Sequence, residues 1–229
     1  MTVGVIVQSR MGSTRLPGKV LLPLGGKPSI IRVLERASQI SGIDRVIVAT
    51  TTLRQDLQLV DVVRSAGYEA VMPTATPDNV LSRYYWTAKQ FKFDTIVRIT
   101  GDCPLLDPAV SSRVVGVSES GRWDYVSNRQ PATFPDGFDT EVFDFDTLER
   151  TYKQASDNYS REHVTPYINQ SKEFTVQNVW NTKDQSMIRL TLDTHEDYDY
   201  IKYVYDELGD NPRTKDILEL PRQRIVDRV

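Results

Sequence analysis

Strand-like and helix-like segments alternate through the first half of the chain, and this alternation restricts the fold more than any other sequence feature. The strand-like segments are short and rich in β-branched residues. Each is followed by a stretch in which apolar residues recur at helical spacing. Such an order predicts an α/β protein with parallel strands joined by crossover helices. The expected strands are 3–7, 45–51, 68–72 and 94–100, and the expected helices are 28–40, 56–66, 78–91 and 108–119.

The second half of the chain is less regular. No linker or internal repeat separates it from the first half, so we expect residues 1–229 to form one domain around one mixed sheet. Thr194, followed by acidic residues, is typical of a helix N-terminus. The elements expected here are a turn at 135–139, helices near 146–155, 160–169 and 198–208, and strands at 174–180 and 188–192.

The composition excludes several classes of protein. The chain has a net charge of −3 and its basic residues are dispersed, which argues against a nucleic-acid partner. Cys103 is the single cysteine, and no N-terminal targeting segment is evident. No apolar run reaches the roughly 18 residues that a membrane span needs. We therefore expect a cytoplasmic protein without a membrane partner.

A basic, glycine-rich segment at residues 8–19 follows the first expected strand. Open α/β sheets bind ligands at the carboxyl ends of their strands, and this segment lies at such an end. Glycine lets the backbone approach a phosphate closely, while hydroxyl groups and the cations Arg10, Arg15 and Lys19 supply donors and charge. The spacing matches neither the dinucleotide-binding fingerprint nor the ATPase phosphate loop. We interpret the segment as a triphosphate-binding loop, against the alternative of an ordinary basic surface loop.

Two aspartates follow expected strands that are far apart in the sequence. Asp102 comes directly after strand 94–100, and Asp193 comes directly after strand 188–192. Mg²⁺ prefers one or two carboxylates together with substrate phosphates, so this pair predicts a shared magnesium site. The alternative is that each aspartate caps the helix that follows it.

Polar clusters in the second half predict the binding site of an acceptor. They lie at 125–129, 135–141 and 160–163, in segments expected to be loops or helix starts. Arg161 and His163 are candidates for binding an acidic group; alternatively, Arg161 pairs with Glu162 in solvent and His163 is structural. The candidate acceptor-binding residues are Asn128, Asp136, Asp139, Arg161 and His163.

Segments 8–19 and 98–107, with the weaker segments 77–84 and 157–166, resemble the cytidylyltransferase family that includes the SpsF-type spore coat polysaccharide biosynthesis protein. The chain is more distantly similar to the CMP-Kdo and CMP-sialic acid synthetases. The resemblance implies the nucleotide-diphospho-sugar transferase fold, also called GT-A, a Rossmann-like α/β/α sandwich with a mixed, largely parallel sheet. It also implies transfer of CMP from CTP to a small acidic acceptor, in cell-surface or spore-coat polysaccharide biosynthesis.

The resemblance also assigns roles to individual residues. Gly12 would let the phosphates approach, and Asp102 and Asp193 would hold Mg²⁺ as the cofactor. The β- and γ-phosphates would be bound by Arg10, Ser13, Arg15 and Lys19, and the base by Gln8, Asn79 and Arg83. Of these, Arg10, Lys19, Asp102 and Asp193 would be catalytic.

In the expected reaction an acceptor oxygen attacks the α-phosphate in line and pyrophosphate leaves. Asp136 or Asp139 could act as the general base, with metal-bound hydroxide as the alternative. A GT-A glycosyltransferase is the first competing interpretation, although only one acid stands close to the strand end in Gly101-Asp-Cys-Pro104. The others are a nucleotidyltransferase for another nucleoside triphosphate and a binding module without catalysis. Aromatic residues in the C-terminal half make a homodimer plausible.

Overall fold

The β-sheet at the centre of the molecule has the strand order β5-β4-β1-β6-β8-β7-β9 in a computed structural model that describes residues 1–221. Within this part of the chain, β8 is the one strand of the sheet that runs antiparallel to the others. The expected mixed, largely parallel sheet is thus confirmed. The strands are β1 (Val3–Gln8), β4 (Arg45–Ala49), β5 (Glu69–Val71), β6 (Thr95–Thr100), β7 (Tyr125–Ser127), β8 (Glu141–Asp144) and β9 (Val176–Asn178).

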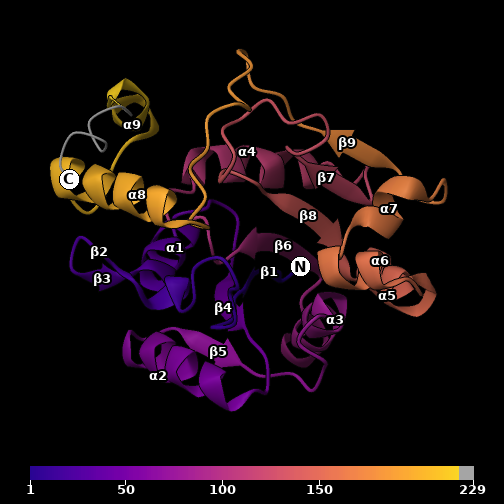
Figure 1. The fold of residues 1–229 in the computed structure, drawn as a ribbon. Helices are drawn as coiled ribbons and strands as arrows, with labels where there is room; N and C mark the ends of the chain where they lie inside the picture. Colours follow the sequence, from indigo (N-terminus) through magenta and orange to yellow (C-terminus); the bar gives the residue numbers. More distant parts are fainter. Residues whose placement is uncertain (222–229) are drawn as a thin grey trace.

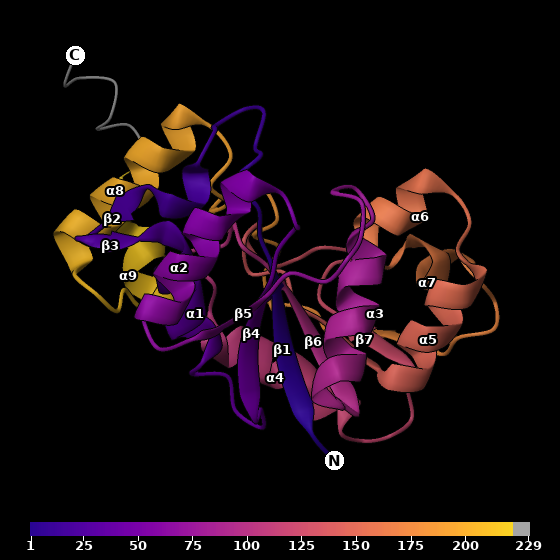
Figure 2. The ribbon, with the colours of Figure 1, turned by 90° about the horizontal axis from the view of Figure 1, so that it is seen from below.

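Helices cover both faces of this sheet and make a three-layered α/β/α arrangement (Figures 1 and 2). No helix within residues 1–221 combines the length and apolar character needed to cross a membrane. The first face is covered by α1 (Ser29–Ala37), α2 (Leu57–Ser65) and α4 (Pro108–Ser118), and α8 (His195–Leu208) and α9 (Thr214–Glu219) extend the same core. The second face carries α3 (Val80–Phe91), α5 (Phe145–Gln154), α6 (Asn158–His163) and α7 (Pro166–Gln170).

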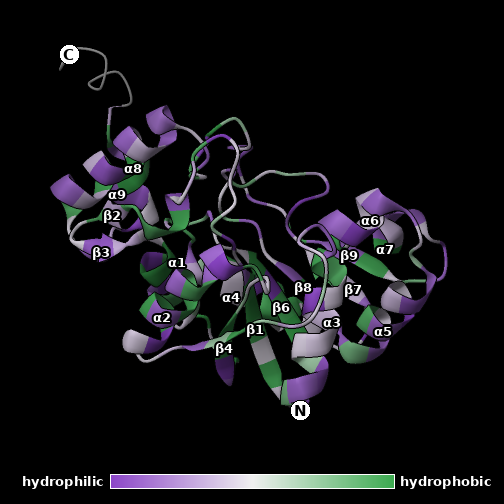
Figure 3. Cartoon of the chain, turned by 60° about the horizontal axis from the view of Figure 1, so that its bottom comes forward, coloured by the Kyte–Doolittle hydropathy of each residue, from purple (hydrophilic) through white to green (hydrophobic). Residues whose placement is uncertain are grey.

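The central strands are apolar on both sides because both faces of the sheet are covered. In β1, Val5 and Val7 pack in the core of the first face and Ile6 packs in the core of the second, and all three are fully buried. Each such side chain contributes roughly 1.5–3 kcal/mol through removal from water. Figure 3 shows the apolar residues gathered on β1 and β6. This continuous apolar character is the pattern expected for buried parallel strands.

The strand order places a topological switch point between β1 and β6. The chain passes from β1 to β4 on one side and later returns to β6 on the other side of β1. Connections after the two strands therefore leave in opposite directions, which opens a crevice at their carboxyl ends. Gln8 and Thr100 are paired in register as the last residues of these strands. The loop at 9–18 and Asp102 both follow directly, so the crevice is where the two sequence motifs meet.

The irregular second half departs from the expected elements. Segment 188–192 is not a strand, because it pairs with the sheet region through a single bridge between Arg189 and Asp136. The expected helix over 160–169 is divided into α6 and α7 at Val164, whose φ is 73°. The short strands β7 and β8 were not expected from the sequence. Also unexpected were α9, the hairpin of β2 (Pro23–Leu24) and β3 (Lys27–Pro28), and the 3₁₀ turns at Lys19–Leu21 and Arg54–Asp56.

Gly137 fixes segment 188–192 against the turn at 135–139. It has a φ of +110°, and a Cβ added there would lie 2.9 Å from the Leu190 carbonyl carbon and 3.1 Å from the Thr191 nitrogen. Gly137→Ala should lower the free energy of unfolding by about 2–4 kcal/mol, because strain at φ adds to a backbone clash. Gly26→Ala is the matched control, since Gly26 has a φ of +80° and open space around it. It should cost about 1 kcal/mol. Urea unfolding that gives equal losses for the two variants would contradict the clash.

Candidate functional site

The loop after β1 is held in one conformation by backbone and side-chain hydrogen bonds. The Met11 amide donates to Oδ1 of the fully buried Asp56 at 2.7 Å, and Asp56 in turn accepts from the Thr51 hydroxyl. Gly18, with a φ of 69°, closes the loop through its amide to the Met11 carbonyl at 3.2 Å. Sequence reasoning missed Asp56, whose position in an expected helix gave no sign of this contact. The loop is therefore preorganised without a ligand.

Lys19 lies between the two aspartates that were expected to share a metal. Its Nζ is 3.1 Å from Asp102 Oδ2 and 2.7 Å from Asp193 Oδ1. Its side chain is only 12% exposed, and that of Asp193 is 13% exposed. Burial opposes the charge on Lys19, but the two carboxylates outweigh it and raise the pKa of the lysine. The structure thus brings together residues 19, 102 and 193, from three distant parts of the chain.

A backbone contact places Asp193 beside Asp102. The Leu192 amide donates to the Asp102 carbonyl at 2.8 Å. Immediately before it, the Leu190 amide donates to the Asp136 carbonyl at 2.7 Å. The expected position of Asp193 beside Asp102 is correct, but its structural basis is different. Asp193 follows an extended segment that is hydrogen-bonded to Asp136 and Asp102, and this segment is not a strand of the sheet.

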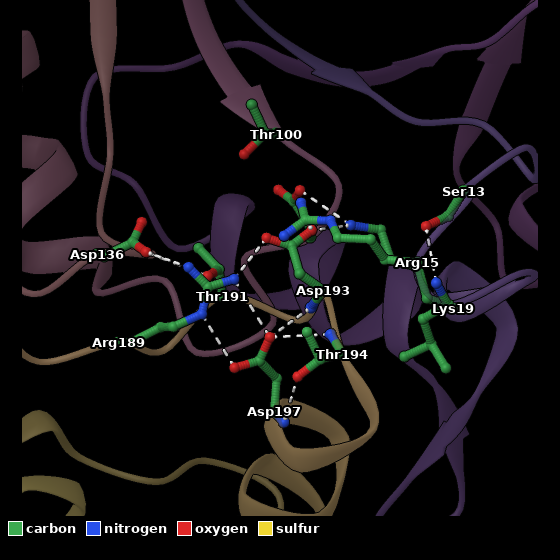
Figure 4. Close-up of polar contacts among 12 residues, drawn as sticks. Ser13, Arg15, Lys19, Thr100, Asp136, Arg189, Thr191, Asp193, Thr194 and Asp197 are labelled. Atoms are coloured by element: carbon green, nitrogen blue, oxygen red, sulfur yellow. Dashed lines mark hydrogen bonds and ion pairs between the residues drawn. The ribbon is translucent and has the colours of Figure 1, made fainter.

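Asp193 is surrounded by cations (Figure 4). Besides Lys19, Arg15 Nη2 lies 2.9 Å from its Oδ1 and Arg189 Nη2 lies 2.6 Å from its Oδ2. Burial raises the pKa of Asp193, but hydrogen bonds from Lys19 and Arg189 more than offset this, so the pKa falls below its usual value. Sequence reasoning missed Arg189, because its segment was taken for a strand and its other partners, Asp136 and Asp197, are distant or in the next helix.

Helix α8 fixes the position of Asp193 from behind. Thr194 and Asp197 form a capping box, in which the Thr194 hydroxyl accepts from the Asp197 amide and the Asp197 carboxylate accepts from the Thr194 amide. The same Asp197 oxygen accepts from the Asp193 amide at 2.9 Å. The expected helix start at Thr194 is confirmed, and Asp193 precedes the cap residue instead of being it.

Two cavities open side by side around this centre. The first has a volume of about 360 Å³ and lies over the loop after β1; the second has a volume of about 620 Å³ and extends toward α6 and α7. Their shared lining residues are Gln8, Arg15, Thr100, Asp102, His163 and Asp193. A ligand in one cavity can therefore meet a ligand in the other at the aspartate pair.

Most residues expected at the nucleotide line the first cavity. These lining residues are Gln8, Arg10, Gly12, Ser13, Arg15, Lys19, Arg83 and Asp102. Arg83 is 3% exposed, and its Nε and Nη1 find no hydrogen-bond acceptor among the described residues. Burial lowers the pKa of Arg83. Buried donors without partners at the wall of a cavity mark a position where a ligand supplies the acceptor.

Asn79 differs from this expectation. It caps helix α3, where its Oδ1 accepts from the Ser82 amide at 3.0 Å. It does not belong to the lining of the first cavity as far as the described chain defines it. A side chain whose oxygen is used by the helix is a poor base contact, so we do not retain Asn79 in the nucleotide site.

The residues expected at the acceptor divide into two groups. Asp136, Asp139 and His163 line the second cavity. Asn128 is buried within the chain turn, where it donates to the Phe138 carbonyl and accepts from the Thr140 amide, so its role is structural. The Arg161 guanidinium lies over the Tyr152 ring on α5, 5.2 Å from the ring centre, and lines neither cavity within the part of the chain described. We therefore do not retain Asn128 or Arg161.

A buried charge network lies behind Asp139. Glu141 accepts hydrogen bonds from the Tyr125 and Thr165 hydroxyls, both at 2.6 Å, and forms an ion pair with Arg98. Arg129 contacts both Glu141 and Asp139, the latter at 2.9 Å. Sequence reasoning missed this network, whose members lie on different elements.

Burial is the main cause of an unusually high pKa at Asp139. Together with the nearby negative charges of Glu141 and Asp136, it raises the pKa of Asp139 to about 6, although Arg129 acts in the opposite direction. Such a carboxyl group changes its protonation near neutral pH, which is a property that acid–base chemistry requires.

A loop suited to phosphate at the switch point, with two carboxylates beneath it, is the arrangement of a nucleotidyltransferase. Comparison with known proteins makes this specific: the chain belongs to the cytidylyltransferase family, whose model matches residues 4–217. The resemblance stated from the motifs is thus confirmed.

The chain is similar to several proteins over most of their length. A protein of Methanocaldococcus jannaschii described as uncharacterized is 36% identical over 96% of this chain and 95% of its own length. The spore coat polysaccharide biosynthesis protein SpsF of Bacillus subtilis is 31% identical over 90% of this chain and 88% of its own length. The solved structure of a cytidylyltransferase from Leptospira borgpetersenii is 34% identical, with a TM-score of 0.89 over 96% of this chain and 93% of that chain.

A more distant structure supports the fold. The CMP-2-keto-3-deoxy-manno-octonic acid synthetase solved in complex with CTP is 17% identical, with a TM-score of 0.70 over 90% of this chain and 99% of that chain. At this identity the likeness concerns the fold, and it agrees with the expected nucleotide-diphospho-sugar transferase architecture.

The capping role of Asn79 can be tested separately from nucleotide binding. Asn79→Ala should lower the free energy of unfolding by about 1 kcal/mol, because the Ser82 amide loses its acceptor, while CTP affinity stays the same. Asn79→Ser keeps a capping oxygen and should keep most of the stability. Urea unfolding and calorimetric titration with CTP measure the two quantities. Weaker CTP binding by both variants would return Asn79 to the nucleotide site.

Proposed function

We propose that the protein transfers CMP from CTP to a small acceptor and releases pyrophosphate. The observation that carries this proposal is the convergence of Asp102 and Asp193 on Lys19 beneath the loop after β1. The family and the names of similar proteins support CTP as the donor and a sugar as the acceptor. The name of SpsF supports a role in polysaccharide biosynthesis.

The two carboxylates suit a divalent cation. One nitrogen, Lys19 Nζ, lies within 3.1 Å of an oxygen of each, so both carboxylates already point to a single position. Within residues 1–221 there is no group of three or more His, Cys, Asp or Glu side chains able to hold a metal. Two protein oxygens completed by phosphate oxygens are the coordination that Mg²⁺ prefers. When bound, Mg²⁺ would supply positive charge to the α- and β-phosphate oxygens at Asp102 and Asp193.

The remaining chemistry consists of positioning and charge stabilisation by the loop. Arg10, Arg15 and Lys19 line the first cavity and place positive charge beside the departing pyrophosphate. Gly12 allows the phosphates close to the backbone, since a Cβ there would meet only the end of the Gln55 side chain. As the acceptor oxygen attacks the α-phosphorus, the bond to pyrophosphate breaks and the loop holds the leaving group.

Base recognition is assigned to Arg83 and Gln8. The buried Arg83 offers donors without protein acceptors, and the Oε1 of Gln8 is buried without a donor in the described structure. Cytosine carries a carbonyl oxygen and a ring nitrogen as acceptors beside an amino donor. A guanidinium and an amide oxygen complement this edge.

The acceptor is assigned to the second cavity, with Asp139 as the general base. His163 and Asp136 line the same cavity. Asp136 is already used by Arg189 and by the Thr191 hydroxyl, at 3.0 and 3.2 Å. Asp139 contacts Arg129, and its pKa of about 6 suits it to take a proton from an acceptor hydroxyl.

Removing either aspartate of the pair should abolish most turnover. Asp102→Asn and Asp193→Asn should each slow pyrophosphate release on the order of a hundredfold to a thousandfold or more, because the position loses a charge that the metal needs. The double variant should be hardly slower than either single one, since the two groups act as one unit. Asp78→Asn is the control, because Asp78 lines the first cavity but pairs with Arg10. Losses that multiply would show that the two carboxylates do not share a metal.

The pH profile tests the base. Asp139 must be ionised to accept a proton, so kcat/KM should rise about tenfold per pH unit up to pH of about 6 and level off above it. Asp139→Asn should remove this limb and lower the rate on the order of 10² to 10⁴. Asp136→Asn should keep the limb. Pyrophosphate release with 3-deoxy-manno-octulosonate, or another acidic sugar that proves active, provides the measurement. An Asp139→Asn enzyme with the wild-type profile would rule out this role.

A further inference from the structure

Lys19 is in an unusual position for a residue that binds phosphate. Its Nζ contacts both Asp102 and Asp193, and it lies deeper than Arg15, whose side chain is 61% exposed. Both oxygens of Asp193 are used by cations, because Arg15 and Lys19 contact Oδ1 and Arg189 contacts Oδ2. The Lys19 ammonium group therefore occupies the place between the two carboxylates.

This arrangement weakens the binding of a metal cation to Asp102 and Asp193 when no nucleotide is bound. Two carboxylates that close on one point repel each other unless positive charge lies between them, and Lys19 provides that charge. A free Mg²⁺ ion would have to displace the ammonium group, and within residues 1–221 no other carboxylate contacts Lys19 to receive it. The phosphates of a nucleotide in the first cavity would offer it new acceptors.

On the basis of the proposed function, we propose that Lys19 is a positioning residue that keeps Asp102 and Asp193 together without metal and excludes Mg²⁺ until nucleotide binds. Nucleotide phosphates would draw Lys19 away from the carboxylates, and Asp102 and Asp193 would then be free to hold Mg²⁺. Metal and nucleotide binding are coupled by this exchange, and the coupling is reciprocal.

Binding of Mg²⁺ alone tests the proposal without any acceptor. In the absence of nucleotide, Lys19→Met should bind Mg²⁺ at least about tenfold more tightly than the wild type, because two carboxylates are left without their shared cation. Lys19→Arg keeps the positive charge and should exclude the metal as the wild type does. Lys27→Met is the matched control, because Lys27 pairs with Glu35 and Asp210 and lines neither cavity. Calorimetric titration and the Mg²⁺ dependence of Tm are the two readouts.

Each outcome decides the question. Equal Mg²⁺ affinity in Lys19→Met and the wild type overturns the proposal, and so does tight binding of Mg²⁺ alone, below about 0.1 mM, by the wild type. Should Lys19→Met not fold, Lys19→Gln and the wild-type titration still apply. Failure of the proposed function looks different: then neither CTP nor CTP with Mg²⁺ stabilises the wild type, whatever Lys19→Met does with the metal alone.

Discussion

The hydrogen bond from the Leu192 amide to the Asp102 carbonyl is the contact on which the site depends. At 2.8 Å it joins the end of β6 to a segment 90 positions later, and it sets Asp193 beside Asp102. The turn around Gly137 supports it, because Asp136 pairs with Ile188 and Leu190 on either side of Arg189. A side chain at position 137 would push this segment away. The backbone pairing thus places the two carboxylates side by side, and the positive charge of Lys19 between them offsets their mutual repulsion.

The carboxylates in the crevice are each compensated by neighbouring cations. Lys19, Arg15 and Arg189 surround Asp193, while Arg98 and Arg129 surround Glu141 behind the second cavity. Buried ions of this kind persist because each has a partner, and removing one leaves the other uncompensated. Under the proposed function, Arg15 and Lys19 of the loop after β1 would exchange these carboxylates for phosphates. Arg83 is different, since two of its buried nitrogens have no acceptor among the described residues.

The first half of the fold and most residues that line the first cavity could be predicted from the sequence, because local patterns encode them. Buried parallel strands such as β1 are continuous apolar runs, and loop 8–19 follows such a strand directly. The second half could not be predicted in the same way. β7 and β8 are short. Segment 188–192 is held extended by backbone hydrogen bonds to Asp136 and Asp102 and not by continuous pairing with a strand. Asn79 shows the same limit, since a cap and a ligand contact look alike in sequence.

Selective stabilisation by a nucleotide tests the central claim most directly, namely that the crevice between β1 and β6 binds CTP with Mg²⁺. Thermal unfolding would be compared with CTP, UTP, ATP and GTP, each with and without Mg²⁺. At a concentration a hundred times its dissociation constant, CTP with Mg²⁺ should add about 2.7 kcal/mol, or roughly 5 to 11 °C in Tm for a chain of this size. The other nucleotides should shift Tm less at the same concentration. A shift with CTP no larger than with the other three would contradict the account.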